Sequence, residues 1–191
     1  MPDKNLQLSY ADQEYLLEGV GESVYPRVAP AANGAAATTQ SLRLVGMLCK
    51  RTEPISNIAF STGTTAAGAT PTLVRYGLWE RSPLRESYSL VASTVSDLTL
   101  LVAANTRYPK ATSAPYTKQQ GQEYLVGCLV VSAAAMPTFQ QYSTAIYTGF
   151  AAQLLLPPVR TAQLAAQADL PAIITVSALT ISNNSYICDL F

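Results

Sequence analysis

Acidic side chains are the only groups in this chain whose types and spacing leave acid–base catalysis open. The sequence holds no histidine, so neither a Ser-His-Asp nor a Cys-His arrangement can form, and the most common zinc ligand is missing. Two carboxylates about 5 to 10 Å apart can still cleave a glycosidic bond. The acids that follow residue 40 are Glu53, Glu80, Glu86, Asp97, Glu123, Asp169 and Asp189.

Two of these acids, Glu80 and Glu86, flank a predicted turn that also carries Arg81 and Arg85. Solvent-exposed ion pairing explains such a cluster without catalysis. The chain also lacks a GxSxG elbow, an SxxK nucleophile signature and a glycine-rich phosphate loop. We therefore expect a protein that is not an enzyme and that uses neither a metal nor a cofactor, with a carboxylate-only glycan hydrolase as the catalytic alternative.

Trp79 is the residue whose type best suits binding. It is the only tryptophan, and it stands at the end of a predicted strand beside Arg75, Tyr76 and Arg81. An exposed indole near a loop could stack on a sugar ring, which makes Trp79 a candidate contact for a host-surface glycan. The alternative is a tryptophan buried in the core of a β-sandwich.

Other partner classes are disfavoured by composition. The basic residues are scattered, no basic run exceeds Lys50 and Arg51, and the calculated pI is 6.2, so we expect no nucleic-acid partner. No stretch approaches the roughly 20 apolar residues of a membrane span, and the first residues do not read as a signal peptide. We expect synthesis and retention in a cytoplasm, with Cys49, Cys128 and Cys188 as buried free thiols.

Short apolar runs that alternate with polar residues, separated by Pro, Gly and Ser, predict an all-β fold. Eight strand candidates are the number that a jelly roll needs. We therefore expect a jelly-roll-like antiparallel β-sandwich over residues 41–191. The candidates are residues 42–49, 54–61, 72–80, 87–93, 98–103, 122–132, 144–156 and 172–190, the last broken near Asn183.

The connections between these runs carry topological information. Pro83, inside ERSPLRES, predicts a hairpin turn. Residues 61–71 (STGTTAAGATP) have no periodicity and predict a surface loop, and residues 106–120 (TRYPKATSAPYTKQQ) are a second loop that could present side chains to a glycan. Asp97 could instead cap a short helical turn where residues 98–103 are predicted as a strand.

Residues 1–40 form the predicted N-terminal arm and linker. Ser9 followed by Asp12 resembles a helix start, and Gly19 a stop. A helix this short needs a surface to lie against, which is either its own domain or another subunit. Residues 29–41 are small and without pattern, as in a linker. The candidate assembly contacts of the arm are Tyr10, Tyr15, Leu16 and Leu17.

Charge supports a role in assembly. Only 13% of the residues are charged, well below the roughly 25% of typical soluble domains, which suits a surface covered by neighbours. The charge is also uneven: residues 1–22 hold five acids against Lys4, whereas the rest of the chain holds seven acids and eleven bases. The arm is thus net negative and the body net positive.

One ordered series of segments in the sequence resembles a known group of proteins. ATPTLVRYGLWE, SYSLVAST, an Asp-Leu-Thr-Leu segment and GQEYLVGCLVVSAAAMPTF follow one another and lead to a Tyr-containing strand at the C-terminus. This series resembles the β-sandwich modules of virion proteins of tailed phages that infect actinobacteria. The resemblance covers roughly residues 40–191 and rests on the pattern TPTLxRxGLxE followed by GQxYxVGxLVV.

The resemblance implies a jelly-roll-like fold, trimerisation in many members, and no metal or cofactor. It carries over no functional residue, because its motif marks strands and turns. We expect a structural virion protein, a homotrimer that contacts tail or major capsid protein and is assembled in the host cytoplasm. A minor tail or fibre module is the leading expectation, a capsid decoration protein that clamps the head lattice through its arm is the alternative, and a carbohydrate-binding module is a further one.

Overall fold

A computed structural model describes residues 22–23, 30–33, 36–67, 71–133, 136–142, 161–181 and 185–191. Over these residues the protein is all-β with antiparallel pairing, as the sequence predicts. The 3₁₀ turn η2 (Val176–Ala178) is the one helical element of the described residues. The predicted arm helix, with its contacts Tyr10, Tyr15, Leu16 and Leu17, lies outside them, and so does the predicted strand 144–156.

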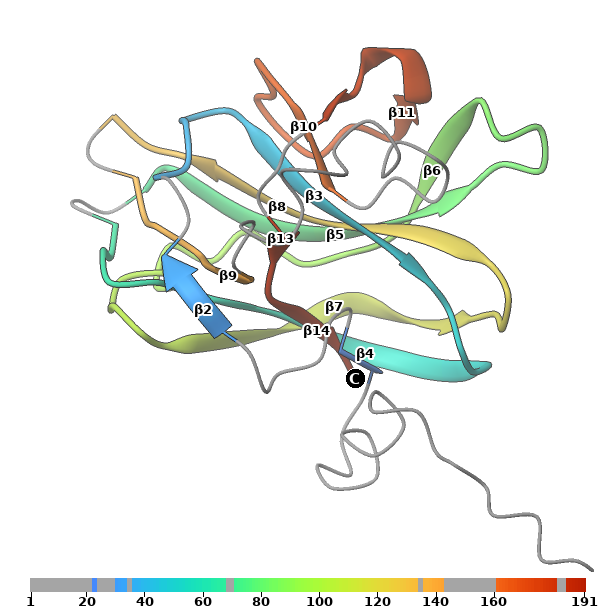
Figure 1. The fold of residues 1–191 in the computed structure, drawn as a ribbon, viewed down its shortest axis with the longest axis horizontal. Helices are drawn as coiled ribbons and strands as arrows, with labels where there is room; N and C mark the ends of the chain where they lie inside the picture. Colours follow the sequence, from blue (N-terminus) through green and yellow to red (C-terminus); the bar gives the residue numbers. More distant parts are fainter. Residues whose placement is uncertain are drawn as a thin grey trace, which may run out of the picture.

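Six long strands form the framework of the fold and pair in a nested order. The first pairs with the last (β3 with β8), the second with the fifth (β4 with β7) and the third with the fourth (β5 with β6), while β5 also pairs with β8. One long antiparallel hairpin, rolled over on itself, produces this order (Figure 1). The strands are β3 (Leu42–Leu48), β4 (Glu53–Ser61), β5 (Leu73–Arg81), β6 (Ser87–Ser93), β7 (Arg107–Lys118) and β8 (Glu123–Val131).

The shorter strands extend the framework into three sheets. The large sheet has the order β11-β6-β5-β8-β3-β10-β12, the second sheet β1-β14-β4-β7, and the third β13-β9-β2. These strands are β1 (Glu22–Ser23), β2 (Pro30–Asn33), β9 (Gln140–Tyr142), β10 (Thr161–Leu164), β11 (Ile173–Thr175), β12 (Thr180–Ile181), β13 (Ser185–Tyr186) and β14 (Cys188–Leu190).

The inner core fills the space between the large sheet and the second sheet. Alternate residues of β5, such as Val74, Tyr76 and Leu78, face this core, because successive side chains of a strand point to opposite faces. The ring of Phe60, from the second sheet, packs 5.1 Å from the ring of Tyr76 and 6.0 Å from that of Phe139. This core holds the two layers together, as Figure 1 shows for β4 and β7 beneath β3, β5 and β8.

The outer core lies on the opposite face of the same sheet. Leu42, Leu44, Trp79, Leu125 and Leu129 are buried there. They are covered by residues 161–181, drawn in orange and red above the large sheet in Figure 1. The central strands are therefore buried on both faces, which explains why the run of β8 is almost continuously apolar.

Most of the strand predictions are confirmed, with two clear corrections. The strand predicted at 98–103 is wrong: Asp97 accepts hydrogen bonds from the Thr99 backbone and hydroxyl, and a turn forms instead. Residues 106–120, predicted as a loop, contain the longest strand, β7. Strand β2 lies within the predicted linker, whereas the domain division at residue 40 stays a prediction. The hairpin at Pro83 is confirmed by the β5–β6 pair.

The three cysteines are free and buried, as the sequence predicts. Burial raises the pKa of the Cys128 and Cys188 thiols, so both stay protonated and unreactive near neutral pH. A search of the described residues for a helix long and apolar enough to cross a membrane finds none.

Candidate functional site: the outer face of the large sheet and the C-terminal unit

The candidate site is the outer face of the large sheet together with the segment that covers it. We call residues 161–191 the C-terminal unit. It adds strands to the flanks of the framework, with β10 beside β3, β11 beside β6 and β14 beside β4. Its apolar side chains divide between the two cores, with Tyr186, Cys188 and Leu190 in the inner core. Those that close the outer core are Ala162, Leu164, Leu170, Ile174, Val176 and Leu179.

A pair of glycines makes the seat of Trp79. Gly77 on β5 lies directly opposite Gly127 on β8. A Cβ atom added at Gly77 would lie 2.5 Å from the Trp79 ring, and one added at Gly127 would lie 2.8 Å from both the ring and Leu44. Glycine inside a strand marks a place where another group approaches the backbone closely. The indole therefore lies over the bare backbone of two neighbouring strands.

Trp79 is fully buried in this seat, so the glycan contact expected for it is wrong, and the alternative of a core tryptophan holds. Its indole N–H donates a hydrogen bond of 2.8 Å to the carbonyl of Pro171. A buried indole N–H usually has such a hydrogen-bond partner, because leaving it unpaired would destabilise the fold. The ring is thus both the centre of the outer core and an anchor for the C-terminal unit.

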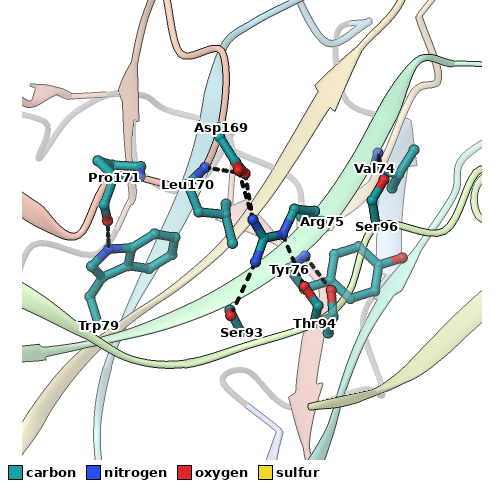
Figure 2. A network of polar contacts seen from close by, with 10 residues as sticks. All are labelled: Val74, Arg75, Tyr76, Trp79, Ser93, Thr94, Ser96, Asp169, Leu170 and Pro171. Atoms are coloured by element: carbon teal, nitrogen blue, oxygen red, sulfur yellow. Dashed lines mark hydrogen bonds and ion pairs between the residues drawn. The ribbon is translucent and has the colours of Figure 1, made fainter. Parts of the chain in front are cut away.

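Arg75 holds the same stretch of the C-terminal unit by a second contact (Figure 2). Its Nη1 donates to both carboxylate oxygens of Asp169, at 2.7 and 2.8 Å. The other guanidinium nitrogens donate to the framework, Nε to the Thr94 carbonyl and Nη2 to the Ser93 hydroxyl. Asp169 also accepts the N–H of Leu170. We call the Arg75–Asp169 pair the latch, because it joins β5 to the unit.

Further backbone bonds and one charged pair dock the unit along its length. The N–H of Leu90 donates to Ala172, and that of Val176 to Glu86. Near the C-terminus, Arg107 of β7 donates to the almost fully buried Asp189 at 2.8 Å. The guanidinium of Arg107 also lies 4.7 Å from the centre of the Phe191 ring. The unit is therefore bound at both of its ends.

The framework has two unlike ends. At one end the strands are joined by the short connections 49–52, 82–86 and 119–122, and charged residues gather there. Glu123 pairs with Arg81 and with Arg85, and Glu53 pairs with the fully buried Lys118. At the other end the connections are long and poor in charge, and Val95, Leu98 and Val102 are exposed.

The acids that could have formed a catalytic pair are nearly all engaged. Glu80 accepts the hydroxyl proton of Tyr116 at 2.7 Å, and Asp97 accepts Lys110 Nζ at 2.6 Å. Glu86 is exposed; every other candidate acid bonds a cation or a hydroxyl group. The pairs are Glu53–Lys118, Glu80–Tyr116, Glu123 with Arg81 and Arg85, Asp97–Lys110, Asp169–Arg75 and Asp189–Arg107.

These contacts shift the proton affinity of two partners. The hydrogen bond from Lys110, followed by those from Thr99, lowers the pKa of Asp97 to about 2. Burial, and then the bond to Glu80, raises the pKa of the Tyr116 hydroxyl. Asp97 therefore stays ionised and Tyr116 stays protonated at neutral pH, each in the state that its contact needs.

Comparison with known proteins identifies no relative: neither the known family models nor the curated proteins contain a match to this chain. Among the described residues, no three His, Cys, Asp or Glu side chains are grouped so that they could hold a metal ion. What the site does must therefore be argued from its own contacts.

Sequence reasoning missed the residues that build this site. Gly77 and Gly127 were not singled out, although two glycines inside predicted strands are a signal of close backbone approach, and Asp169 was named only as a candidate acid. The latch left no comparable signal, because Arg75 and Asp169 are far apart in the sequence and either could pair with any exposed opposite charge. Trp79 was singled out for an exposed role that its seat excludes.

Proposed function

We propose that this chain is a non-enzymatic structural protein of a tailed-phage virion, a jelly-roll-like β-sandwich module of the minor tail or fibre type. The observation that carries the proposal is the engagement of the acids. All the acids that the sequence leaves for catalysis, except the exposed Glu86, bond a cation or a hydroxyl group of the fold, and this engagement supports a structural role for them.

The nested strand pairing supports the jelly-roll part of the proposal. A jelly roll wraps a long antiparallel hairpin into two facing sheets, and the pairs β3–β8, β4–β7 and β5–β6 follow that order. The framework has six such strands, fewer than the usual eight, and the C-terminal unit supplies the flanking strands. The sequence resemblance to phage β-sandwich modules covers this same region and supports the virion part.

Self-association into a homotrimer belongs to the proposal, because closed symmetry lets one surface patch repeat around an axis. Light scattering of the full chain and of residues 22–191 measures it. We expect a trimer for both, since the framework would carry the contacts. A trimer for the full chain alone would assign assembly to residues 1–21 and favour the arm as the clamp of a decoration protein. If both proteins are monomers, the proposed homotrimer is wrong.

The direct test is the protein content of purified particles produced by the genome that encodes the chain. We expect mass spectrometry to find it in stoichiometric amount, and electron microscopy with a labelled antibody to place it on the tail. Labelling of the head would move it to the decoration class. Absence from the particles would overturn the proposal, and a glycan array that then shows binding would favour a carbohydrate-binding module.

A further inference from the structure

Arg43 is a buried basic side chain that pairs with no acid among the described residues. Three basic side chains are buried in that part of the chain, and the other two, Arg81 and Lys118, each pair with a glutamate. Arg43 is only 6% exposed, and its guanidinium bonds two neutral side chains, those of Gln163 and Thr38. A buried charge without a counter-ion is costly, so buried charges are normally paired. The site around this arginine therefore suits an anion.

The unfilled donors of Arg43 lie on one edge of its guanidinium plane. Nη1 donates to the side-chain oxygen of Gln163, whereas Nε is buried and has no hydrogen-bond partner among the described residues. Nη2 has only a contact of 3.4 Å to the hydroxyl of the exposed Thr38, longer than the usual limit of about 3.2 Å for an N–H···O bond. The Nε and Nη2 protons point the same way and match the two oxygens of a carboxylate.

This edge of Arg43 lies on the inner face of the large sheet. Leu42 and Leu44 face the outer core, and successive side chains of a strand alternate, so Arg43 points to the opposite face. It is directly opposite Cys128 on β8 and Gln163 on β10, and Cys128 belongs to the inner core. Burial raises the pKa of the Cys128 thiol, and the charge of Arg43 offsets part of that rise. The site therefore borders the inner core.

Few carboxylates of the chain are left to fill this site. Every acid whose side chain the structure describes, apart from Glu86, already bonds a cation or a hydroxyl group. Glu86 belongs to the connection 82–86, at the charged end of the framework. Outside the described residues, acids occur only in residues 1–21, where there are four against one base. They are Asp3, Asp12, Glu14 and Glu18, and the base is Lys4.

Residues 1–21 join the described structure at β1, beside the same core. Ser23 of β1 lies opposite Asp189 of β14. The neighbouring residue of β14, Cys188, lies in the inner core together with Cys128. Burial raises the pKa of the Cys188 thiol, and Asp189 and Cys128 add to the rise, which agrees with two neighbouring thiols. A segment of this length can extend to roughly 70 Å, so its acids are within reach of the site.

We propose that a carboxylate of residues 1–21 binds the Nε and Nη2 edge of Arg43 in the same chain. The occupant of the site is then the acidic N-terminal segment, which neutralises the buried charge and is held against the border of the inner core. Opposite charge favours this occupant, because the segment is net negative and the rest of the chain net positive. The inference goes beyond the proposed function and does not depend on it, since it concerns contacts within one chain.

A double-mutant cycle in the full chain tests this pair by urea unfolding. Arg43→Gln removes the charge, and a second variant neutralises the segment with Asp3→Asn, Asp12→Asn, Glu14→Gln and Glu18→Gln. With the native segment, Arg43→Gln should raise the unfolding equilibrium constant about tenfold, because it breaks the pair. With the neutral segment, the same change should raise it less than about twofold or lower it, since it then removes a buried unpaired charge. Equal effects in the two backgrounds would overturn the proposal.

Arg85→Gln is the matched control, because it removes the same charge from an exposed position at the charged end of the framework. Its effect should agree within about twofold between the two backgrounds. The difference measured for Arg43→Gln should also be independent of protein concentration. A difference that grows with concentration would assign the carboxylate to a second copy and overturn docking within the chain.

A second measurement leaves the buried arginine in place and so does not depend on the folding of Arg43→Gln. Nuclear magnetic resonance of the full chain observes the Nε proton of Arg43, which is assigned by its loss in Arg43→Lys. Neutralising the four acids of residues 1–21 should shift this signal and speed its exchange with water, because the carboxylate that holds the proton is gone. An unchanged signal and exchange rate would overturn the proposal.

Discussion

The two cores of this protein lie on opposite faces of one sheet and are closed in different ways. The inner core is closed mainly by β4 and β7, which belong to the nested hairpin and pair over much of their length, together with Tyr186, Cys188 and Leu190 near the C-terminus. The outer core is closed by short strands and loops of the C-terminal unit. Local stability follows buried contacts and backbone pairing, so the inner core should define global stability and the outer core should open first.

This difference separates the contacts that the framework needs from those that only cover its outer face. Opening the inner core requires the large sheet to separate from β4 and β7. The outer core is closed by residues 161–181, which can leave the sheet face while the strand pairs of the framework stay formed. Small changes at Trp79, Arg75 and Asp169, which hold residues 169–171 to β5, should therefore loosen the outer cover before they unfold the framework.

The largest effect is expected from Phe60→Ala. The ring packs against Tyr76 and Phe139 between the two layers, and removing a buried phenylalanine costs about 3 to 5 kcal/mol. Urea unfolding should show this loss in a single transition, since both layers depend on the ring. Leu84→Ala, at a highly exposed turn position, is the control and should stay within about 0.5 kcal/mol. A loss below about 1 kcal/mol would mean that the inner core does not define stability.

A smaller effect is expected from Gly127→Ala. The added methyl would meet the Trp79 ring and Leu44 at 2.8 Å, and such overpacking costs about 1 to 3 kcal/mol. Urea unfolding measures the loss. Combined with Trp79→Phe, which empties part of the seat, the same change should cost at least about 0.5 kcal/mol less, a coupling typical of residues in contact. Additive losses would show that the glycine is not there to seat the indole.

The latch should contribute less than either core. Asp169 is about half exposed, with 55% of its side chain accessible, and exposed ion pairs are worth about 1 kcal/mol or less. Asp169→Asn should therefore leave global stability nearly unchanged while it speeds hydrogen exchange in β11. Glu86→Gln, an exposed acid without a partner cation among the described residues, is the matched control. Equal effects of the two variants on hydrogen exchange in β11 would show that the Arg75–Asp169 pair does not hold this strand.

The smallest effect is expected at acid pH. The fold lowers the pKa of Asp97 from its ordinary value of 3.8 to about 2, chiefly through the hydrogen bond from Lys110, so the folded state binds this proton less readily than the unfolded chain. The contribution is complete above about pH 4 and is lost as the pH falls toward 2. Asp97→Asn should flatten the fall of the melting temperature between pH 4 and 2. An unchanged slope would contradict the bond to Lys110.

Local sequence patterns predict the strands of the framework but not the contacts between residues that are far apart in the sequence. The alternation in β5, β6 and β8 predicts these strands almost to the residue, because each side chain's environment repeats along the strand. The prediction for β7 is wrong because Pro109 and Pro115 suggest a loop. An edge strand nevertheless tolerates proline at positions where no backbone N–H has to pair with a neighbouring strand. At 98–103, the Asp97 cap outweighs a run of leucines.

The candidate site is harder to predict than the fold. One sequence cannot tell whether Trp79 is exposed, since the answer depends on Gly77, Gly127 and Pro171 from three parts of the chain. The pairing of Arg75 with Asp169 depends on how the C-terminal unit crosses the sheet. Contacts of this kind depend on the topology of the whole chain, and the local sequence pattern determines that topology only in part.

Native-state hydrogen exchange of the full chain measures the difference between the two cores most directly. We expect amides of β10 and β11 to open together at a free energy clearly below that of β5 and β8, whereas β14, whose Cys188 and Leu190 lie in the inner core, stays protected with the framework. A single opening free energy for all of these strands would contradict a separable unit, and the outer core would then be part of one indivisible fold.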